Sequence, residues 1–243
     1  MMGANKTTAA TGAARSPMRA RYREQVREDV KAVALDQLAQ GGATAVSVNA
    51  IAKQLGVSGP ALYRYFAGRD ELLAELVIDT YHDFAAALAA ATDPALGQAP
   101  AERLRALAAA WRAFARAEPH RYTLMFAPPV PGYDAHSEPL VTASREVMAV
   151  GLDVAADLWP PDDSPAAAPG REGDVDLDAA VRAHEDILAA TGAGPEQLRR
   201  VLSAWTRLHG FVSLEIGGNF TSMGIDADAL FAQEVSALSA TTA

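Results

Sequence analysis

The chain has 243 residues, half of them apolar, and a net charge of −9. This length can form one large core, or a small domain beside a larger one. The absence of cysteine excludes a disulfide framework and a thiolate metal site. No segment approaches the roughly 18 apolar residues of a membrane span, and the N-terminus lacks the apolar run of a secretory signal. We therefore expect a cytoplasmic protein with no membrane partner.

Charge is distributed unevenly along the sequence. Residues 1–70 contain ten basic and five acidic side chains, a charge of +5, so residues 71–243 carry −14. A basic N-terminal part beside an acidic remainder is typical of a protein that binds nucleic-acid phosphates. A basic surface that is merely solvated has the same composition, so charge alone leaves both interpretations open.

The N-terminal part is expected to contain an arm and three helices. Residues 1–18 are small, polar and basic, and predict a flexible arm. Residues 19–68 have helical periodicity: the paired glycines at 41–42 end the first helix, and Gly56 separates the second from the third.

The remainder, residues 69–243, is expected to form a larger helical domain. Apolar stripes predict a long helix from about Asp70, with Leu76, Tyr81, Phe84 and Leu88 facing this domain. A loop rich in proline, aspartate, alanine and glycine is predicted to be mobile, because such composition cannot bury much apolar surface. The loop covers residues 160–173, and further helices are predicted over residues 101–117, 120–126, 137–158, 176–191, 195–216 and 226–240.

The segment Ser47–Leu73 carries the most specific pattern, SVNAIAKQLGVSGPALYRYFAGRDELL. It predicts two short helices that meet at Gly56, where glycine enters a left-handed turn without steric cost. A helix of this size fits the roughly 12 Å major groove of DNA. The apolar cluster between the helices is predicted to comprise Ile51, Leu55, Val57, Leu62 and Phe66.

Together with the preceding GGATAVSV, this segment resembles the signature of the TetR family. The resemblance implies a helix-turn-helix whose recognition helix covers Ser58–Tyr65, with Tyr63 and Arg69 near phosphates. The DNA-binding residues that it implies are Asn49, Ser58, Gly59, Pro60, Ala61, Tyr63, Arg64, Tyr65 and Arg69.

Simpler roles remain open for several of these residues. Tyr65 could close the small core, Arg64 could be a solubilising charge, and Gly59 and Pro60 could only start their helix. The basic side chains of the arm could reach phosphates or the minor groove, or belong to a disordered leader. They are Arg15, Arg19, Arg21 and Arg23.

A second resemblance covers Ala204–Phe220, AWTRLHGFVSLEIGGNF, where Trp205, His209 and Gly210 match a C-terminal domain type named for its Trp-His-Gly pattern. It implies a body that binds a small molecule and dimerises through its last two long helices. Two apolar stripes fit a four-helix bundle across a twofold axis, or packing within one chain. They comprise Leu198, Val201, Leu202, Trp205, Leu208, Val212 and Ile216, and Leu230, Phe231, Val235 and Leu238.

Large apolar side chains with polar tips are candidates for the ligand site, because such residues line small-molecule cavities. Each could equally be ordinary core, and His209 could only fix helix packing. The candidates are Trp111, Phe114, Tyr122, Met125, Phe126, Met148, Leu152, Trp205 and His209.

These patterns predict an all-α protein: an N-terminal three-helix helix-turn-helix domain, then a larger helical ligand-binding and dimerisation domain. The predicted function is a dimeric repressor that binds a palindromic DNA operator and is released by a small-molecule effector. We expect no cofactor, no metal and no enzymatic activity, because the sequence lacks G-x-S-x-G, H-E-x-x-H and P-loop motifs. An activator, or a DNA-binding dimer without a natural ligand, remains an alternative.

Overall fold

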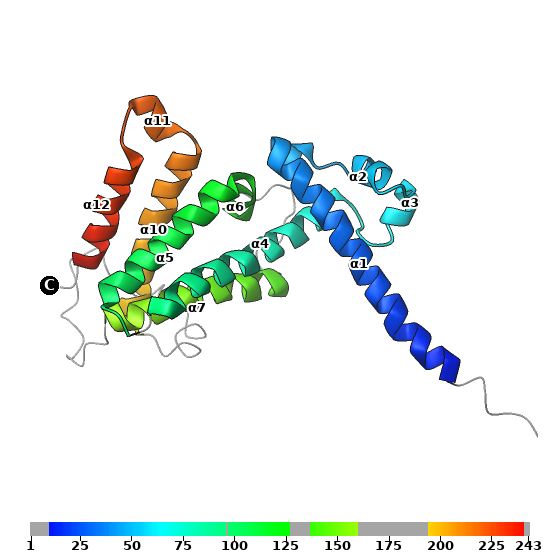
Figure 1. Cartoon of the computed structure of the whole chain (residues 1–243), viewed down its shortest axis with the longest axis horizontal. Helices are drawn as coiled ribbons and strands as arrows, with labels where there is room; N and C mark the ends of the chain where they lie inside the picture. Colours follow the sequence, from blue (N-terminus) through cyan, green and yellow to red (C-terminus); the bar gives the residue numbers. More distant parts are fainter. Residues whose placement is uncertain (1–9, 96, 127–136, 160–193, 241–243) are drawn as a thin grey trace, which may run out of the picture.

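The computed structural model describes residues 10–95, 97–126, 137–159 and 194–240, and within these ranges every regular element is helical (Figure 1). The predicted all-α class is confirmed. The predicted loop at 160–173 and helix at 176–191 lie outside the described residues. The elements are α1 (Ala10–Gly41), η1 (Ala43–Ala45), α2 (Val48–Gln54), α3 (Gly59–Leu62), α4 (Arg69–Thr92), η2 (Asp93–Ala95), α5 (Pro100–Ala117), α6 (Pro119–Phe126), α7 (Glu138–Leu158), α10 (Pro195–Ile216), α11 (Asn219–Met223) and α12 (Ala227–Ala240).

The head gathers α1, α2, α3 and the first turns of α4 around one apolar core. Helix α1 contributes a stripe at helical spacing, including the fully buried Val30 and Leu38. Ser47 caps α2, since its Oγ accepts a hydrogen bond from the backbone N–H of Ala50 at 3.4 Å. Gly56 has a φ of 68°, so the turn between α2 and α3 favours glycine at this position.

Three predictions for the head need correction. Residues 10–18, predicted to belong to a flexible arm, form the start of α1, which extends well beyond the head core (Figure 1). Val57 is 40% exposed and does not join the apolar cluster, because it lies in the turn after α2. Helix α3 ends at Leu62, and the chain continues to Tyr65 as a turn rather than as helix.

Helix α4 passes through both cores. Leu73 and Leu76 lie in the head core, whereas Phe84 and Leu88 lie in the core of the body. The prediction that Leu76 faces the body is therefore wrong, because the head core extends further along α4 than the helix-turn-helix motif does. The head and body are consequently joined by a packed helix rather than by a flexible linker.

The body packs α4, α5, α7, α10 and α12 around its own apolar core. Arg103 on α5 is buried and pairs with Asp153 (2.5 Å) and Asp157 on α7. Two body residues, Leu124 on α6 and Leu140 on α7, belong instead to the head core. The sequence did not predict this second connection between head and body.

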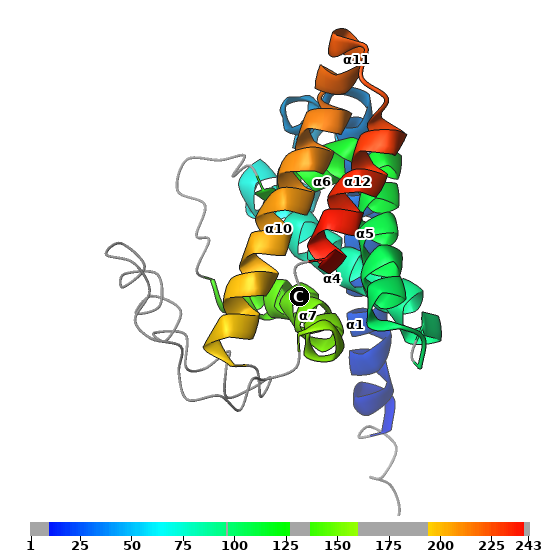
Figure 2. The same cartoon turned by 90° about the vertical axis from the view of Figure 1, so that its left-hand side faces the viewer.

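Helices α10 and α12 run side by side along one side of the body, beside α5 (Figure 2). Their apolar stripes were predicted to form a dimer bundle, but Leu208, Val212 and Val235 are buried in the core of the same chain. Leu202, the predicted centre of the dimer interface, is half-buried against that core. The buried members of both stripes pack within one chain, those of α10 against α5 and α7 and those of α12 against α5 and α10. A dimer that uses the remaining surface of these helices stays a prediction.

Candidate nucleic-acid interface and ligand cavity

The predicted DNA-binding residues lie on α2, α3 and the turns beside them. A Cβ atom added to Gly59 would lie 3.5 Å from Asn49 Oδ1, so the start of α3 lies directly beside the exposed Asn49 of α2. Ser58, Pro60 and Arg64 are also exposed, and half of the surface of Tyr63 is accessible (50%). These side chains are therefore available to a partner without any change in the head core.

Tyr65 differs from Tyr63, because it is half-buried against the head core. Arg27 of α1 donates a hydrogen bond to the carbonyl of Tyr65 at 2.6 Å, pairs with Glu75, and lies 4.5 Å from the centre of the Phe66 ring. Arg27 thus holds the turn after α3 between α1 and α4. The core-closing alternative for Tyr65 agrees with this packing.

Arg69, predicted to meet phosphate, has a structural role at the start of α4. Its Nε donates to the carbonyl of Val46 at 3.1 Å, and its Nη2 donates to the carbonyl of Ala43 at 2.5 Å. These bonds fasten α4 to the segment that precedes α2. The phosphate contact remains a prediction, and the structural role is one that the sequence did not indicate.

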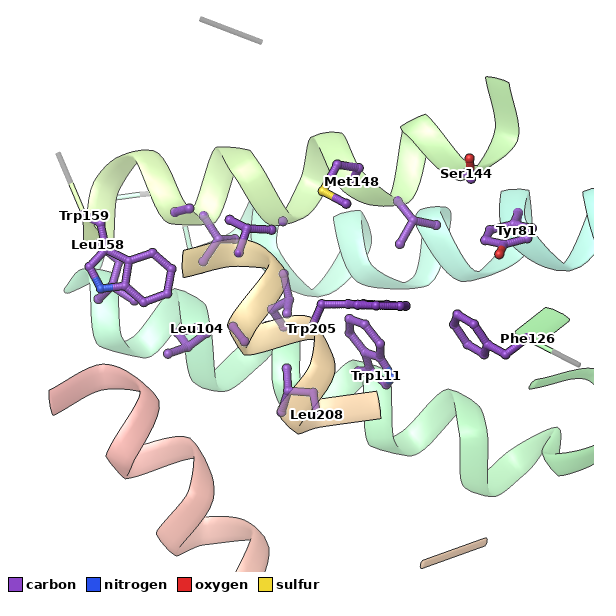
Figure 3. A pocket seen from close by; sticks show the side chains of 17 residues that line it. Tyr81, Leu104, Trp111, Phe126, Ser144, Met148, Leu158, Trp159, Trp205 and Leu208 are labelled. Atoms are coloured by element: carbon purple, nitrogen blue, oxygen red, sulfur yellow. The ribbon is translucent and has the colours of Figure 1, made fainter. Parts of the chain in front are cut away.

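A cavity of about 160 Å³ lies inside the body, between α4, α5, α6, α7 and α10 (Figure 3). Four of the nine predicted ligand residues line it, namely Trp111, Phe126, Met148 and Trp205. The sequence analysis missed the rest of the lining, since helical periodicity cannot distinguish a cavity wall from close-packed core. The other lining residues are Tyr81, Leu104, Leu107, Ser144, Val147, Gly151, Val154, Ala155, Leu158, Trp159, Val201, Ala204 and Leu208.

The other five predicted ligand residues do not line this cavity. Phe114, Met125 and Leu152 belong to the body core or pack against it. Tyr122 and His209 line a second hollow of about 490 Å³ between α6 and α10. Phe126 borders both the cavity and the hollow, so α6 separates the two spaces.

A hydrogen-bonded chain crosses the wall between these spaces. Trp111 Nε1 donates to Tyr122 Oη at 2.8 Å, and Tyr122 Oη lies 2.9 Å from His209 Nδ1. The phenol oxygen accepts from Trp111, and the tautomer of His209 decides which of Tyr122 Oη and His209 Nδ1 donates in the second bond. Burial lowers the pKa of His209 and raises that of Tyr122, so both groups favour their neutral forms.

The Trp-His-Gly pattern supplies part of the same wall. The rings of Trp205 and His209 are stacked, with 5.7 Å between their centres and an interplanar angle of 11°. The centre of the Phe126 ring lies 4.2 Å from the centre of the His209 ring. The four-residue spacing places both side chains on one face of α10. His209 thus packs against neighbouring aromatic rings and lines the second hollow rather than the cavity, and its contact with a ligand remains a prediction.

The described residues contain no group of three or more histidine, aspartate or glutamate side chains that could hold a metal ion. None of the helices in these ranges combines the length and the apolar character that a membrane span requires. The cavity lining itself offers apolar side chains and a few hydroxyl and indole groups.

Two family models match this chain. Residues 32–76 match the bacterial regulatory proteins of the tetR family, and residues 104–238 match the tetracyclin repressor-like C-terminal domain. The second match alone covers more than half of the sequence. The chain belongs to the TetR family. The head and the cavity described above are thus its helix-turn-helix domain and the interior of its C-terminal domain.

Individual relatives of this chain are named as regulators. The HTH-type transcriptional regulator Rv1816 of Mycobacterium tuberculosis H37Rv is 37% identical over 129 residues, 53% of this chain and 54% of the relative. The match thus spans about half the length of that relative. The uncharacterised HTH-type transcriptional regulator Rv0681 of the same strain is 29% identical over 215 residues, which cover 88% of this chain and 80% of that relative. The crystal structure of the protein SCO4313 has a TM-score of 0.72 and 44% identity, over 90% of this chain and 97% of that one.

Helix α6 of this TetR-family chain contacts both the cavity and the head. Phe126 lines the cavity, while Leu124, two residues earlier and on the opposite side of the helix, packs in the head core. At the other end of α6, a Cβ atom on Gly42 would lie 3.7 Å from His120 Nδ1. Helix α6 thus lies beside the end of α1 as well as beside the cavity.

Proposed function

We propose that this protein is a homodimeric repressor that binds a roughly palindromic DNA operator and is released by a small molecule in the body cavity. The observation that carries the proposal is an apolar cavity whose walls include α4, α6 and α7, the three body helices that also contribute residues to the head core. A cavity lined mainly by apolar and aromatic side chains is typical of a ligand site. An enzymatic role has no support from the described side chains.

The dimer is proposed to form across the outer surface of α10 and α12. Leu214 on α10 is 47% exposed, and Gly210 lies one turn before it on the same face. A Cβ atom on Gly210 would meet nothing within 4 Å, although glycine in a helix interior costs about 0.5–1 kcal/mol relative to alanine. Close approach of a second α10 would explain this glycine. Met223 and Ile225, which follow α10 in sequence, are also exposed apolar side chains.

Release is proposed to follow from a shift of α4 and α6. A ligand in the cavity contacts Tyr81 on α4 and Phe126 on α6, and both helices also carry residues of the head core. Moving the two heads of a dimer changes the distance between recognition helices, which must match one DNA turn of roughly 34–36 Å. The ligand needs only a higher affinity for the mismatched state; about 1.4 kcal/mol of difference weakens DNA binding tenfold.

The first experiment selects bound sequences from random DNA and measures operator affinity. Effector candidates are then screened for release, and their affinity is measured with and without saturating operator. Linkage requires operator to weaken effector binding by the same factor by which the effector weakens operator binding. Equal effector affinities in the two measurements would contradict the proposed release mechanism.

A filled-cavity variant supplies the matched control. Ala204 lines the cavity from α10 and is 8% exposed, so Ala204→Leu places extra carbon atoms into the space. We expect normal operator affinity and loss of release by the effector. If Ala204→Leu is released as readily as the wild type, the effector site lies elsewhere.

A further inference from the structure

The two ends of the body cavity differ in the side chains that line them. Figure 3 shows Tyr81 and Ser144 at one end, near Phe126, and Leu158 and Trp159 at the opposite end. Among the lining residues that the structure describes, none carries a formal charge. An anion would lose its hydration there without gaining a cationic partner, which is unfavourable. The cavity therefore disfavours anions.

Two donors of the cavity lining lack a good partner: the Tyr81 hydroxyl at one end and, at the other, the buried Nε1–H of Trp159. The Tyr81 oxygen lies 3.5 Å from the carbonyl of Met125, longer than a normal hydrogen bond. Burial raises the pKa of Tyr81, so the hydroxyl stays protonated at neutral pH. Ser144 Oγ donates to the carbonyl of Val141 at 2.9 Å and can still accept a hydrogen bond. This end of the cavity can thus satisfy a small uncharged polar group.

The rest of the cavity is strongly aromatic. Trp111, Trp159 and Trp205, the three tryptophans of the chain, all line it, together with Phe126. Figure 3 shows Trp205 and Met148 between the two ends, so a flat ring has an aromatic surface beside it. The volume of about 160 Å³ resembles that of an engineered cavity of about 150 Å³ that holds benzene. One substituted ring is therefore an appropriate size.

We propose that the cavity binds an uncharged molecule built on a single aromatic ring, with one hydroxyl or carbonyl oxygen beside Tyr81. This inference deepens the proposed effector site, on which it rests. Tyr81 is the residue that determines specificity, because its O–H has no good partner until such an oxygen is bound.

The test compares three probes that share one ring and one ethyl group. They are para-ethylphenol, ethylbenzene and para-ethylbenzoic acid, the last ionised at neutral pH. Binding is followed by tryptophan fluorescence, which reports on this cavity because all three tryptophans line it, and is checked by calorimetry. We expect para-ethylphenol to bind about 2- to 10-fold more tightly than ethylbenzene, and the acid to bind at least about 10-fold more weakly than the phenol.

The Tyr81→Phe variant isolates the hydroxyl group. It should bind ethylbenzene as the wild type does and lose the preference for para-ethylphenol. Tyr22→Phe is the matched control, because Tyr22 on α1 is 67% exposed and far from the cavity in sequence, and it should change neither affinity. If Tyr81→Phe does not fold, the ranking of the three probes on the wild-type protein tests the proposed ligand class.

The outcomes separate this inference from the proposed function. Equal binding of the acid and the phenol, an unchanged preference in Tyr81→Phe, or no binding of any probe would overturn the ligand class. The effector role would then still be testable with other compounds. The expected ranking without any effect on operator binding would uphold the ligand class and overturn release from DNA.

Discussion

The candidate site of the head lies on the outside of its hydrophobic core, whereas the candidate site of the body lies inside the core of the body. In the head, Asn49 and Tyr63 lie outside a closed core and contribute little to its packing. In the body, the candidate site is a space inside the core, so Trp111 and Trp205 both line the cavity and hold the fold together. Binding and stability should therefore be separable in the head and coupled in the body.

The largest expected effect concerns the head core. Phe66 is 1% exposed and packs under the guanidinium of Arg27, so Phe66→Ala should destabilise the protein by about 3–5 kcal/mol. Urea denaturation followed by circular dichroism measures this change. Tyr63→Ala, three residues away on the surface, is the control and should change stability by less than about 0.5 kcal/mol. Similar losses in both variants would refute the separation of site and core in the head.

The next effect concerns assembly. Leu214→Glu puts an unpaired charge on the exposed face of α10, and burial of that charge in a dry interface should weaken the dimer by about 3 kcal/mol or more. Sedimentation should show folded monomers. Leu202→Glu is the contrasting variant, since Leu202 packs against the body core and its substitution should reduce stability first. A dimeric Leu214→Glu protein would place the interface on another face.

A smaller effect tests the coupling of site and stability in the body. Tyr122→Phe leaves the buried Nε1–H of Trp111 without its acceptor, which should cost about 1–3 kcal/mol in unfolding free energy. The fluorescence of Trp111 should also change, and ligand affinity should change with it because Trp111 lines the cavity. Tyr22→Phe serves as the control. Unchanged stability and unchanged ligand affinity together would argue against coupling.

The corresponding test on the head surface concerns Tyr63 and operator binding. If its hydroxyl meets a phosphate, Tyr63→Phe should weaken operator binding by about 0.5–1.5 kcal/mol, and Tyr63→Ala should weaken it further. Fluorescence anisotropy at fixed salt measures both affinities. Wild-type operator affinity in Tyr63→Ala would show that the recognition surface has been assigned to the wrong residues.

The smallest expected effect is the pH dependence contributed by His209. Burial lowers the pKa of His209 below its usual 6.5, so below this pH the unfolded chain binds a proton that the folded chain resists. Its contribution to stability is present above pH 6.5 and is lost as the pH falls toward the lowered pKa of the folded state. His209→Gln should flatten the dependence of the melting temperature on pH in this range. A steeper dependence in His209→Gln would contradict this sign.

The head was predicted well because its signals are local. The cap at Ser47, the left-handed turn at Gly56 and the apolar spacing from Ile51 to Phe66 depend on neighbours in sequence. Its errors also have a local cause, since Val57 and the end of α3 lie in turns, where helical periodicity does not apply. The structural bonds of Arg69 to Ala43 and Val46 span more than twenty residues and left no sequence signal.

By itself, the sequence determined the all-helical class, the helix-turn-helix and most helix boundaries, since hydrogen bonds, caps and apolar spacing act within a few residues. Only the tertiary structure decided which apolar side chains line a cavity and which fill the core. Trp111 and Leu152 look alike in a helical stripe, yet only Trp111 lines the cavity. The tertiary structure likewise showed that the buried members of the stripes of α10 and α12 pack within one chain. The physical reason is that a cavity arises where five helices fail to fill the space between them, and that failure depends on their relative placement.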